Sequence, residues 1–126
     1  EGGTDSEALF LVALANGLAD DPIGAMARTL ALVRSLARAA EIDEPLRFTA
    51  AYTDGETLVA YRWACDDRPP SLYWRETPTG LLVVSEPIDE TRDGWREIPR
   101  GCTLVARPGA PVALDCMRTA MAREAA

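Results

Sequence analysis

The chain has 126 residues, a net charge of −7 at neutral pH and no histidine. Its length fits one ordinary domain, and 48% hydrophobic with 26% charged residues is the balance of a folded globular protein. The acidic charge disfavours nucleic acid and anionic membranes as partners, while the lack of histidine excludes Ser-His-Asp catalysis, Cys-His catalysis and histidine-ligated metals.

The first predicted element is a helix that begins at Thr4. Thr4-Asp5-Ser6-Glu7 has the spacing of a capping box, in which Thr4 caps the first amides and Glu7 reaches back to the Thr4 amide. Residues 8–15 are apolar on every side, which predicts a helix that needs a covering layer, and Asn16-Gly17 ends it. This run is far shorter than the ~20 residues of a membrane span. No basic stretch precedes it, so we expect a cytosolic protein whose N-terminus, starting at Glu1, was trimmed.

A second helix is predicted after Asp20-Asp21-Pro22, which combines an Asp cap with proline at the first helical position. Its apolar residues recur at steps of three and four, and its arginines fall on the other side. The apolar set is Ile23, Met26, Leu30, Val33, Ala37 and Ala40. The pattern indicates an amphipathic helix.

The middle of the chain predicts antiparallel strands. Asp54-Gly55 lies between two β-rich runs and favours a hairpin with a type I′ turn, and residues 77–80 predict a second hairpin. The expected strands are residues 46–52, 57–63, 71–76, 81–85 and 103–107. Residues 108–111 are a breaker segment, and residues 114–124 are expected to form a short terminal helix. The order predicts an α+β fold with helices layered on a sheet, without a βαβ phosphate-binding unit and without a cofactor.

Neither the cysteines nor the paired carboxylates form a convincing site. Cys65, Cys102 and Cys116 are odd in number and widely spaced, which argues against a disulfide framework and a zinc site, and no histidine is present to activate a thiol. We interpret them as small apolar residues. Adjacent carboxylates point apart and lie in predicted loops, so we expect them to be solvated and to hold no metal. These pairs are Asp20/Asp21, Asp43/Glu44, Asp66/Asp67 and Asp89/Glu90.

Asp5 is the exception, because it lies in the first turn of a helix beside Gly2 and Gly3, where backbone can approach a ligand. One interpretation is simple helix capping, since an acidic first turn is favoured by the helix dipole. The other is a carboxylate that accepts the α-ammonium group of a bound amino acid. The residue pattern leaves both open.

The run Gly3-Thr4-Asp5-Ser6-Glu7-Ala8-Leu9-Phe10 resembles the middle of class II glutamine amidotransferase domains, the N-terminal-nucleophile family that liberates ammonia from glutamine. The resemblance implies that Asp5 holds the α-amino group of glutamine, with Thr4 and Gly3 beside the substrate. It continues through residues 82–87 and 94–101. Residues 1–107 would then be the C-terminal half of an αββα sandwich, and residues 108–126 a tail without counterpart.

Within that family, the Asp54-Gly55 hairpin and Tyr73-Trp74-Arg75 are most similar to a small stand-alone branch, which includes the γ-glutamyl hydrolase of ergothioneine biosynthesis. The resemblance implies a nucleophilic N-terminal cysteine, an Asn-Gly oxyanion pair and an upstream arginine for the substrate carboxylate. The resemblance places all three in the first half of the domain, which is absent from this sequence. We therefore expect it to be inactive alone, and to need a companion N-terminal half that carries the cysteine before it can act on glutamine or a γ-glutamyl small molecule.

Two other hypotheses remain. The chain could be a non-catalytic α+β module that binds a partner protein through its acidic surface, with Thr4 to Glu7 serving only as a cap. It could also be a free amino-acid-binding domain that uses Asp5, although no clamp for the ligand carboxylate is visible in the sequence.

Overall fold

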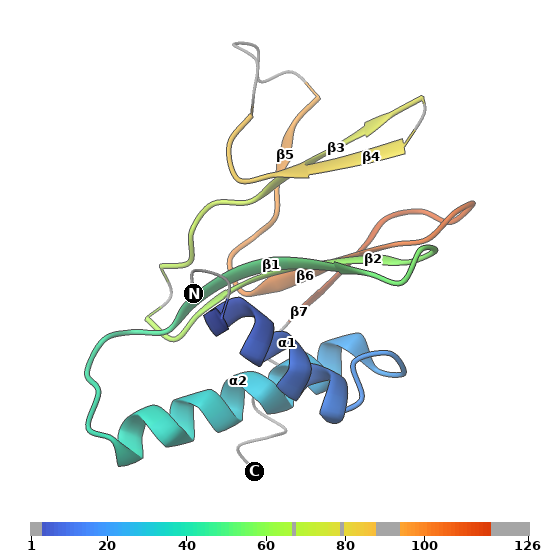
Figure 1. Cartoon of the computed structure of the whole chain (residues 1–126). Coiled ribbons are helices and arrows are strands. Elements are labelled where there is room, and N and C mark those ends of the chain that lie inside the picture. Colours follow the sequence, from blue (N-terminus) through green and yellow to red (C-terminus); the bar gives the residue numbers. More distant parts are fainter. Residues whose placement is uncertain (1–3, 67, 79, 88–93, 117–126) are drawn as a thin grey trace. The chain divides into compact units, whose positions relative to one another are not determined.

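The computed structural model describes residues 4–66, 68–78, 80–87 and 94–116, without the side chains of Thr4, Asp5, Ser6 and Cys116. The described residues fall into two compact units, one ending at Glu44 and the other spanning Pro45–Cys116. The first unit is helical and the second consists of antiparallel sheets (Figure 1). The predicted α+β fold class is confirmed.

The first unit contains α1 (Thr4–Ala15) and α2 (Pro22–Ala39), both beginning where the sequence predicts. Asp21 caps α2 by accepting a hydrogen bond from the Gly24 amide at 3.1 Å. Gly17 ends α1 with φ of 97°, and its amide bonds the Leu14 carbonyl at 3.1 Å. The Leu18 amide reaches the Ala13 carbonyl at 3.0 Å, which completes a Schellman motif.

Polar contacts tie the end of α1 to α2. Arg28 Nη2 donates to the Asn16 carbonyl at 2.7 Å, and Asn16 Nδ2 donates to Thr29 Oγ1 at 3.1 Å. Thr29 is fully buried, and its hydroxyl donates a hydrogen bond to the Ala25 carbonyl at 2.8 Å. Because these groups satisfy one another, the two helices are fixed at their junction.

The second unit is built on a four-stranded antiparallel sheet. In the order β1-β2-β6-β7 it contains β1 (Arg47–Thr53), β2 (Leu58–Ala64), β6 (Cys102–Ala106) and β7 (Ala113–Cys116). The register pairs Ala60 with Ala51 on one side and with Leu104 on the other. The apolar β2 strand therefore lies inside the sheet, with a neighbour on each side.

A three-stranded sheet completes this unit, in the order β4-β3-β5. It contains β3 (Tyr73–Thr77), β4 (Gly80–Val84) and the two-residue β5 (Arg96–Glu97). Trp74 lies opposite Arg96, whose guanidinium carbon is 5.3 Å from the centre of the Trp74 ring. Arg75 lies 5.5 Å from the Trp95 ring in the same way. Two cation–π contacts thus support the short β3–β5 pairing.

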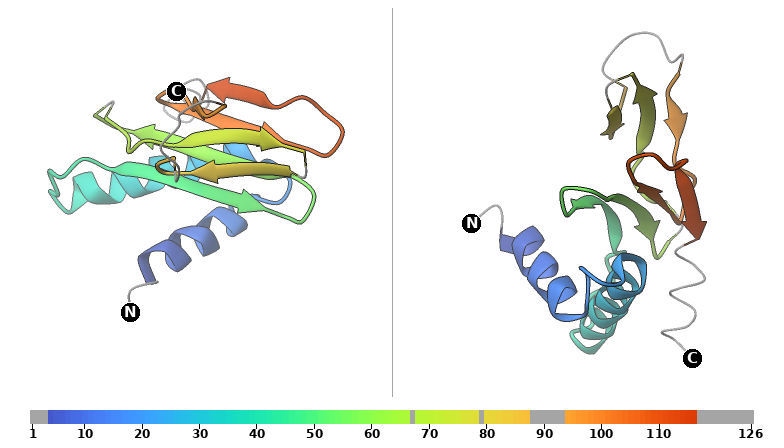
Figure 2. Two further views of the ribbon diagram at one scale, coloured as in Figure 1. Left: turned by 90° about the horizontal axis from the view of Figure 1, so that it is seen from above. Right: turned by 90° about the vertical axis from the view of Figure 1, so that its right-hand side faces the viewer.

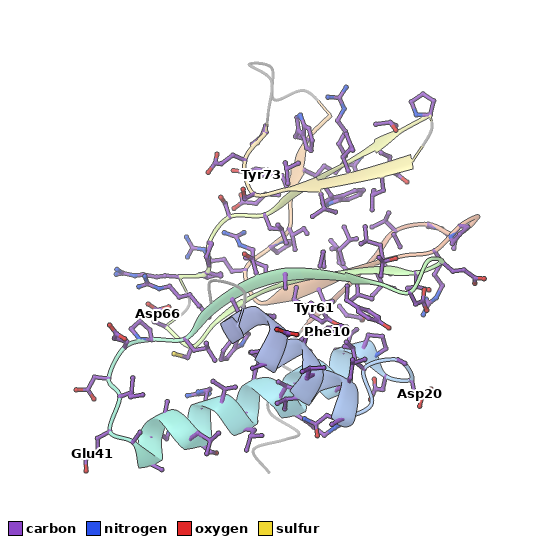
Figure 3. All side chains as sticks on the ribbon, viewed as in Figure 1. Phe10, Asp20, Glu41, Tyr61, Asp66 and Tyr73 are labelled. Atoms are coloured by element: carbon purple, nitrogen blue, oxygen red, sulfur yellow. The ribbon has the colours of Figure 1, made fainter. Side chains whose placement is uncertain are left out.

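The two sheets are separate layers joined by an apolar core (Figure 2). Ala60 and Leu104 come from the four-stranded sheet, and Leu72, Trp74 and Ile98 come from the three-stranded sheet and its flanks. We call these five residues the inter-sheet core. Tyr61 alternates with Ala60 along β2 and lies on the face that points away from the three-stranded sheet (Figure 3). Tyr61 is fully buried.

Arg62 is a buried charge within this unit. Its side chain is 5% exposed, and its Nε donates to the Pro70 carbonyl at 2.8 Å. Its Nη1 donates to Glu97 Oε2 at 2.9 Å and to the Ile98 carbonyl at 2.5 Å. The planar guanidinium of this β2 residue therefore binds the segment before β3 and the segment after β5.

Two local predictions were wrong. The hairpin at Asp54-Gly55 exists, but a type I′ turn needs positive φ at both central residues. The Asp54 amide bonds the Thr57 carbonyl at 3.4 Å, so Gly55 and Glu56 are central, and Gly55 has φ of 97°. Outside glycine, Glu41 is the only described residue with positive φ, so Glu56 does not fit type I′.

The second error concerns the end of the chain. The predicted helix over residues 114–124 is replaced at its start by β7, which pairs Leu114 with Leu104 and Ala113 with Val105. Pairing with a strand that is distant in sequence outweighs the helix preference of alanine and leucine in this segment. Residues 117–124 lie outside the described part of the chain.

Candidate functional site

Asp5 lies in the first turn of α1, one residue after Thr4. The first amides of a helix have no intrahelical partner and carry the positive end of the dipole, so a carboxylate or an anion is stabilised there. Gly3 and the side chains of Thr4 and Asp5 lie outside what the structure describes. The roles given to these residues, including the capping box with Glu7, therefore stay predictions.

The helix that carries Asp5 is anchored at its other end. Its Schellman motif at Gly17 and the Asn16 contacts with Arg28 and Thr29 fix its C-terminus against α2. A Cβ on Gly17 would meet Arg28 Nη2 at 3.6 Å, so the arginine lies directly beside the turn. The position of the first turn is thus set by the rigid helix rather than by a loop.

Most of α1 is exposed, although its residues are apolar. Leu11 is 55% exposed, Phe10 42% and Leu14 40%, whereas Ala13 is fully buried. When several large apolar side chains are exposed together on one helix, they usually form a surface that binds another segment or protein. Among the described residues of the first unit, α2 alone therefore does not complete the covering layer that the sequence predicts for this helix.

Two of the paired carboxylates, Asp21 and Asp66, make local structural contacts. Asp21 caps α2, and Asp66 accepts hydrogen bonds from Arg47 Nη2 at 2.7 Å and from the Arg68 amide at 3.1 Å. The Arg47 guanidinium holds the pKa of the Asp66 carboxyl below its usual range. Among the described residues, no group of three or more Cys, Asp or Glu side chains could hold a metal. Asp67, Asp89 and Glu90 lie outside them.

The cysteines also take structural places. Cys65 Sγ accepts a hydrogen bond from the Leu46 amide at 3.2 Å and is exposed, and Cys102 packs against the inter-sheet core. The β6–β7 register sets Cys116 opposite Cys102, a proximity that their sequence spacing conceals. Cys65 is a free thiol.

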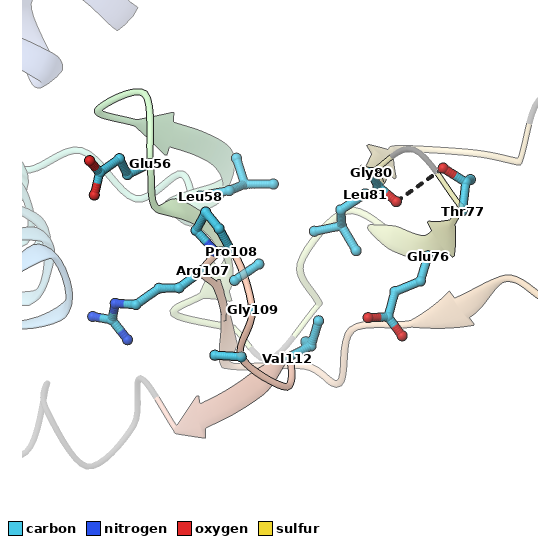
Figure 4. A pocket seen from close by; sticks show the side chains of 12 residues that line it. Glu56, Leu58, Glu76, Thr77, Gly80, Leu81, Arg107, Pro108, Gly109 and Val112 are labelled. Carbon is cyan, nitrogen blue, oxygen red and sulfur yellow. Dashed lines mark hydrogen bonds between the residues drawn. The ribbon is translucent and has the colours of Figure 1, made fainter.

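A groove of about 550 Å³ opens in the second unit and was not anticipated from the sequence. It lies where the hairpin ends of the two sheets meet (Figure 4). Its lining is Glu56, Leu58, Glu76, Thr77, Gly80, Leu81, Ala106, Arg107, Pro108, Gly109, Ala110 and Val112. These residues come from several segments that only strand pairing brings together, so no linear motif marks the groove.

Neither described helix is both long and apolar enough to cross a membrane. No protein-family model matches the chain, and no curated protein matches it. A solved structure does. The glutamine aminotransferase class-II domain protein from Silicibacter pomeroyi aligns with 40% sequence identity and a TM-score of 0.81, over 89% of this chain and 51% of that one. The chain thus spans about half the length of this relative, and it is similar in sequence and in fold to a class II glutamine amidotransferase domain protein.

Proposed function

We propose that this chain is the substrate-binding half of a class II glutamine amidotransferase or γ-glutamyl amide hydrolase domain. The observation that carries the proposal is the 40% identity with a glutamine aminotransferase class-II domain protein over 89% of this chain. In this proposal Asp5 accepts the α-ammonium group of the substrate. The amide bond that is cleaved belongs to the γ-carboxamide of glutamine or to a γ-glutamyl amide.

The catalytic groups are proposed to lie on a companion half. An N-terminal cysteine can use its own α-amine as the base, which suits a chain without histidine. Backbone and asparagine donors of the companion would hold the tetrahedral oxyanion. The present chain then contributes binding and orientation, and it is inactive alone.

The exposed apolar side chains of α1 favour such a companion. Leu11 and Leu14 are 55% and 40% exposed, and the same helix carries Asp5 in its first turn. A companion that covers α1 would therefore lie close to the Asp5 carboxylate, which binds the substrate in this proposal. Burial of apolar surface of this kind stabilises a complex by roughly 25 cal/mol per Å² before the entropy lost on association is subtracted.

The small stand-alone branch is the preferred relative within the family. The Asp54-Gly55 hairpin and Tyr73-Trp74-Arg75, which open β3, carry that resemblance. This preference favours γ-glutamyl amides over free glutamine as substrates. Comparison of the two substrate types in one assay tests it directly.

The test is reconstitution. The half of the Silicibacter pomeroyi relative that this chain does not cover is produced as a separate polypeptide and mixed with this chain, and release of glutamate from glutamine and from γ-glutamyl amides is measured. We expect hydrolysis by the mixture and none by either part. If the two parts associate but the mixture hydrolyses neither substrate, the non-catalytic α+β module is favoured. A second result would also favour that module: this chain by itself is a monodisperse monomer that unfolds cooperatively.

A further inference from the structure

Strand pairing brings two of the three cysteines to one position of the four-stranded sheet. Cys102 is the first residue of β6 and Cys116 is the last residue of β7, and the antiparallel register sets them directly opposite one another. The same register pairs Leu104 with Leu114 further along the two strands. Because a shift of the register by one residue would send the two cysteines to opposite faces, their pairing is a property of this sheet.

Residues that lie opposite one another in an antiparallel pair have the separation that a disulfide requires. Their Cα atoms are about 4.5 to 5.5 Å apart, and their side chains project to the same face of the sheet. A disulfide spans Cα separations of roughly 4.4 to 6.8 Å. A bond between Cys102 and Cys116 therefore needs no change in the strand pairing.

The strand that carries Cys116 is held to the sheet on one side only. In the order β1-β2-β6-β7, β6 is the single neighbour of β7 among the described strands (Figure 1), and Ala113, Leu114 and Asp115 are all exposed. The segment from Leu114 onward also has the composition of a helix, which competes with the strand. An exposed edge strand of this kind opens locally at a lower free energy than the sheet interior, so a covalent link at its end has a large effect on it.

We propose that Cys102 and Cys116 form a reversible disulfide that fastens β7 to β6. The oxidant is a small disulfide such as oxidised glutathione. One protein thiolate attacks it, forms a mixed disulfide and releases one small thiol, and the second protein thiolate then attacks the protein sulfur and releases the other. Two protein thiols are oxidised, and the small disulfide is reduced to two thiols that take up the two protons. Both strands belong to the second unit, so this bond is independent of Asp5 and of any companion half.

The bond changes stability as well as local opening. It closes a loop of about 15 residues that contains the turn at Pro108-Gly109. Such a cross-link restricts the unfolded chain, so the thermal midpoint of the oxidised protein should exceed that of the reduced protein by at least about 5 °C. Amide hydrogen exchange in residues 113–116 should slow on oxidation, because β7 then opens less often.

The experiment uses the full chain, equilibrated with mixtures of reduced and oxidised glutathione. Remaining thiols are alkylated, and proteolytic peptides are mapped by mass spectrometry. We expect two peptides linked through Cys102 and Cys116, with Cys65 outside the link. Reduction by a dithiol should remove the link and return the thermal midpoint and the hydrogen exchange of β7 to their values before oxidation.

A matched control moves one thiol by a single residue. When Asp115→Cys is combined with Cys116→Ser, the thiol lies opposite Thr103 and projects to the other face of the sheet. We expect this variant to form at least about tenfold less intramolecular link than the parent, because the two Cβ vectors then point apart. Cys65→Ser removes the remaining cysteine and should leave the link unchanged. Circular dichroism checks that each variant is folded, and the result for the parent decides the question if a variant is not.

Several results would overturn the inference. The folded parent could form no link, or it could link through Cys65 instead. The shifted variant could link as readily as the parent, which would mean that the strand register does not direct the bond. A link between Cys102 and Cys116 that changes neither the thermal midpoint nor the hydrogen exchange of β7 would show that the bond does not fasten the strand.

Discussion

Arg62 and Glu97 form an ion pair in which the arginine side chain is 5% exposed and the glutamate side chain 52% exposed. The two atoms, Arg62 Nη1 and Glu97 Oε2, are 2.9 Å apart. Because the same guanidinium also serves the Pro70 and Ile98 carbonyls, the pair is one part of a buried network and not an isolated surface contact. Because Arg62 is buried and Glu97 is half exposed, replacing Arg62 should lower the free energy of unfolding more than replacing Glu97.

Arg62→Leu is expected to lower the free energy of unfolding by about 2–4 kcal/mol, because it leaves the Pro70 and Ile98 carbonyls without their donor. Glu97→Gln is expected to have a smaller effect, since the half-exposed amide can still accept a hydrogen bond. Chemical denaturation followed by tryptophan fluorescence measures both. Equal losses for the two variants would contradict the network description.

The carboxylate of Asp54 makes the stability of the first hairpin depend on pH. The amides of Thr57 and Glu56 donate to its carboxylate at 2.8 and 2.9 Å, and these bonds hold the pKa of Asp54 below its usual value. A lowered folded-state pKa stabilises the fold above the unfolded value, about 3.9, and this contribution is lost as pH falls through the folded-state pKa. Asp54→Ala should therefore destabilise at about pH 7 and differ progressively less from the parent in acid. Thermal midpoints of both proteins across this pH range supply the measurement, and a gap that stays constant down to about pH 2 would contradict it.

Thr103 offers a stabilising substitution. It is fully buried in β6, and its Oγ1 has no hydrogen-bond partner among the described residues. Thr103→Val keeps the shape and removes a hydroxyl that is stripped of water without compensation, so stability should rise by about 1 kcal/mol. Thr29→Val is the matched contrast, because Thr29 Oγ1 bonds both Asn16 and Ala25 and its loss should destabilise. A rise in midpoint for both variants would mean that the hydrogen bonds of Thr29 contribute nothing.

Gly17→Ala tests the turn that ends α1. The positive φ of 97° is strained for alanine and should lower stability by about 1–2 kcal/mol, although the added Cβ meets Arg28 only at an ordinary contact distance of 3.6 Å. Far-ultraviolet circular dichroism during thermal unfolding follows the effect. Gly55→Ala, whose Cβ would meet nothing within 4 Å, isolates the backbone strain from packing.

Asp5→Asn tests the proposed substrate contact in the reconstituted protein. Asparagine remains a good group at a helix start but lacks the charge that an α-ammonium requires, so KM should rise at least about tenfold while the unfolding midpoint of the chain changes little. Steady-state kinetics with glutamine and a γ-glutamyl amide give the comparison. A loss of stability with unchanged kinetics would leave capping as the whole role of Asp5.

Local signals predicted the helices and the hairpins well, because their information is contiguous. Asp21-Pro22 and Gly17 define helix ends through backbone geometry that depends on few neighbours. The Asp54-Gly55 dipeptide correctly predicted the position of a hairpin. It did not predict the turn type, because that depends on which two residues pair at the end of the strands. Gly55 became the first central residue because the Asp54 side chain bonds the Glu56 and Thr57 amides.

The features that the sequence did not predict depend on partners far along the chain. β5 is two charged residues, Arg96 and Glu97, whose strand geometry comes from pairing with Trp74 and Tyr73. β7 was mistaken for the start of a helix because its pairing with β6 is invisible locally. The groove escaped notice for the same reason. Asp5, in contrast, was singled out from a contiguous motif, and its role in substrate binding stays a prediction.

Under the proposed function, the apolar surface of α1 makes the stability of this chain depend on the concentration of its companion as well as on its own sequence. A partner that binds only the folded chain raises the apparent unfolding midpoint by mass action, in proportion to the logarithm of its free concentration above the dissociation constant. Under the proposed function, a midpoint measured on this chain alone is a lower bound on its stability beside the companion. In a cell the amount of folded chain would then follow the supply of that companion, which couples abundance to assembly.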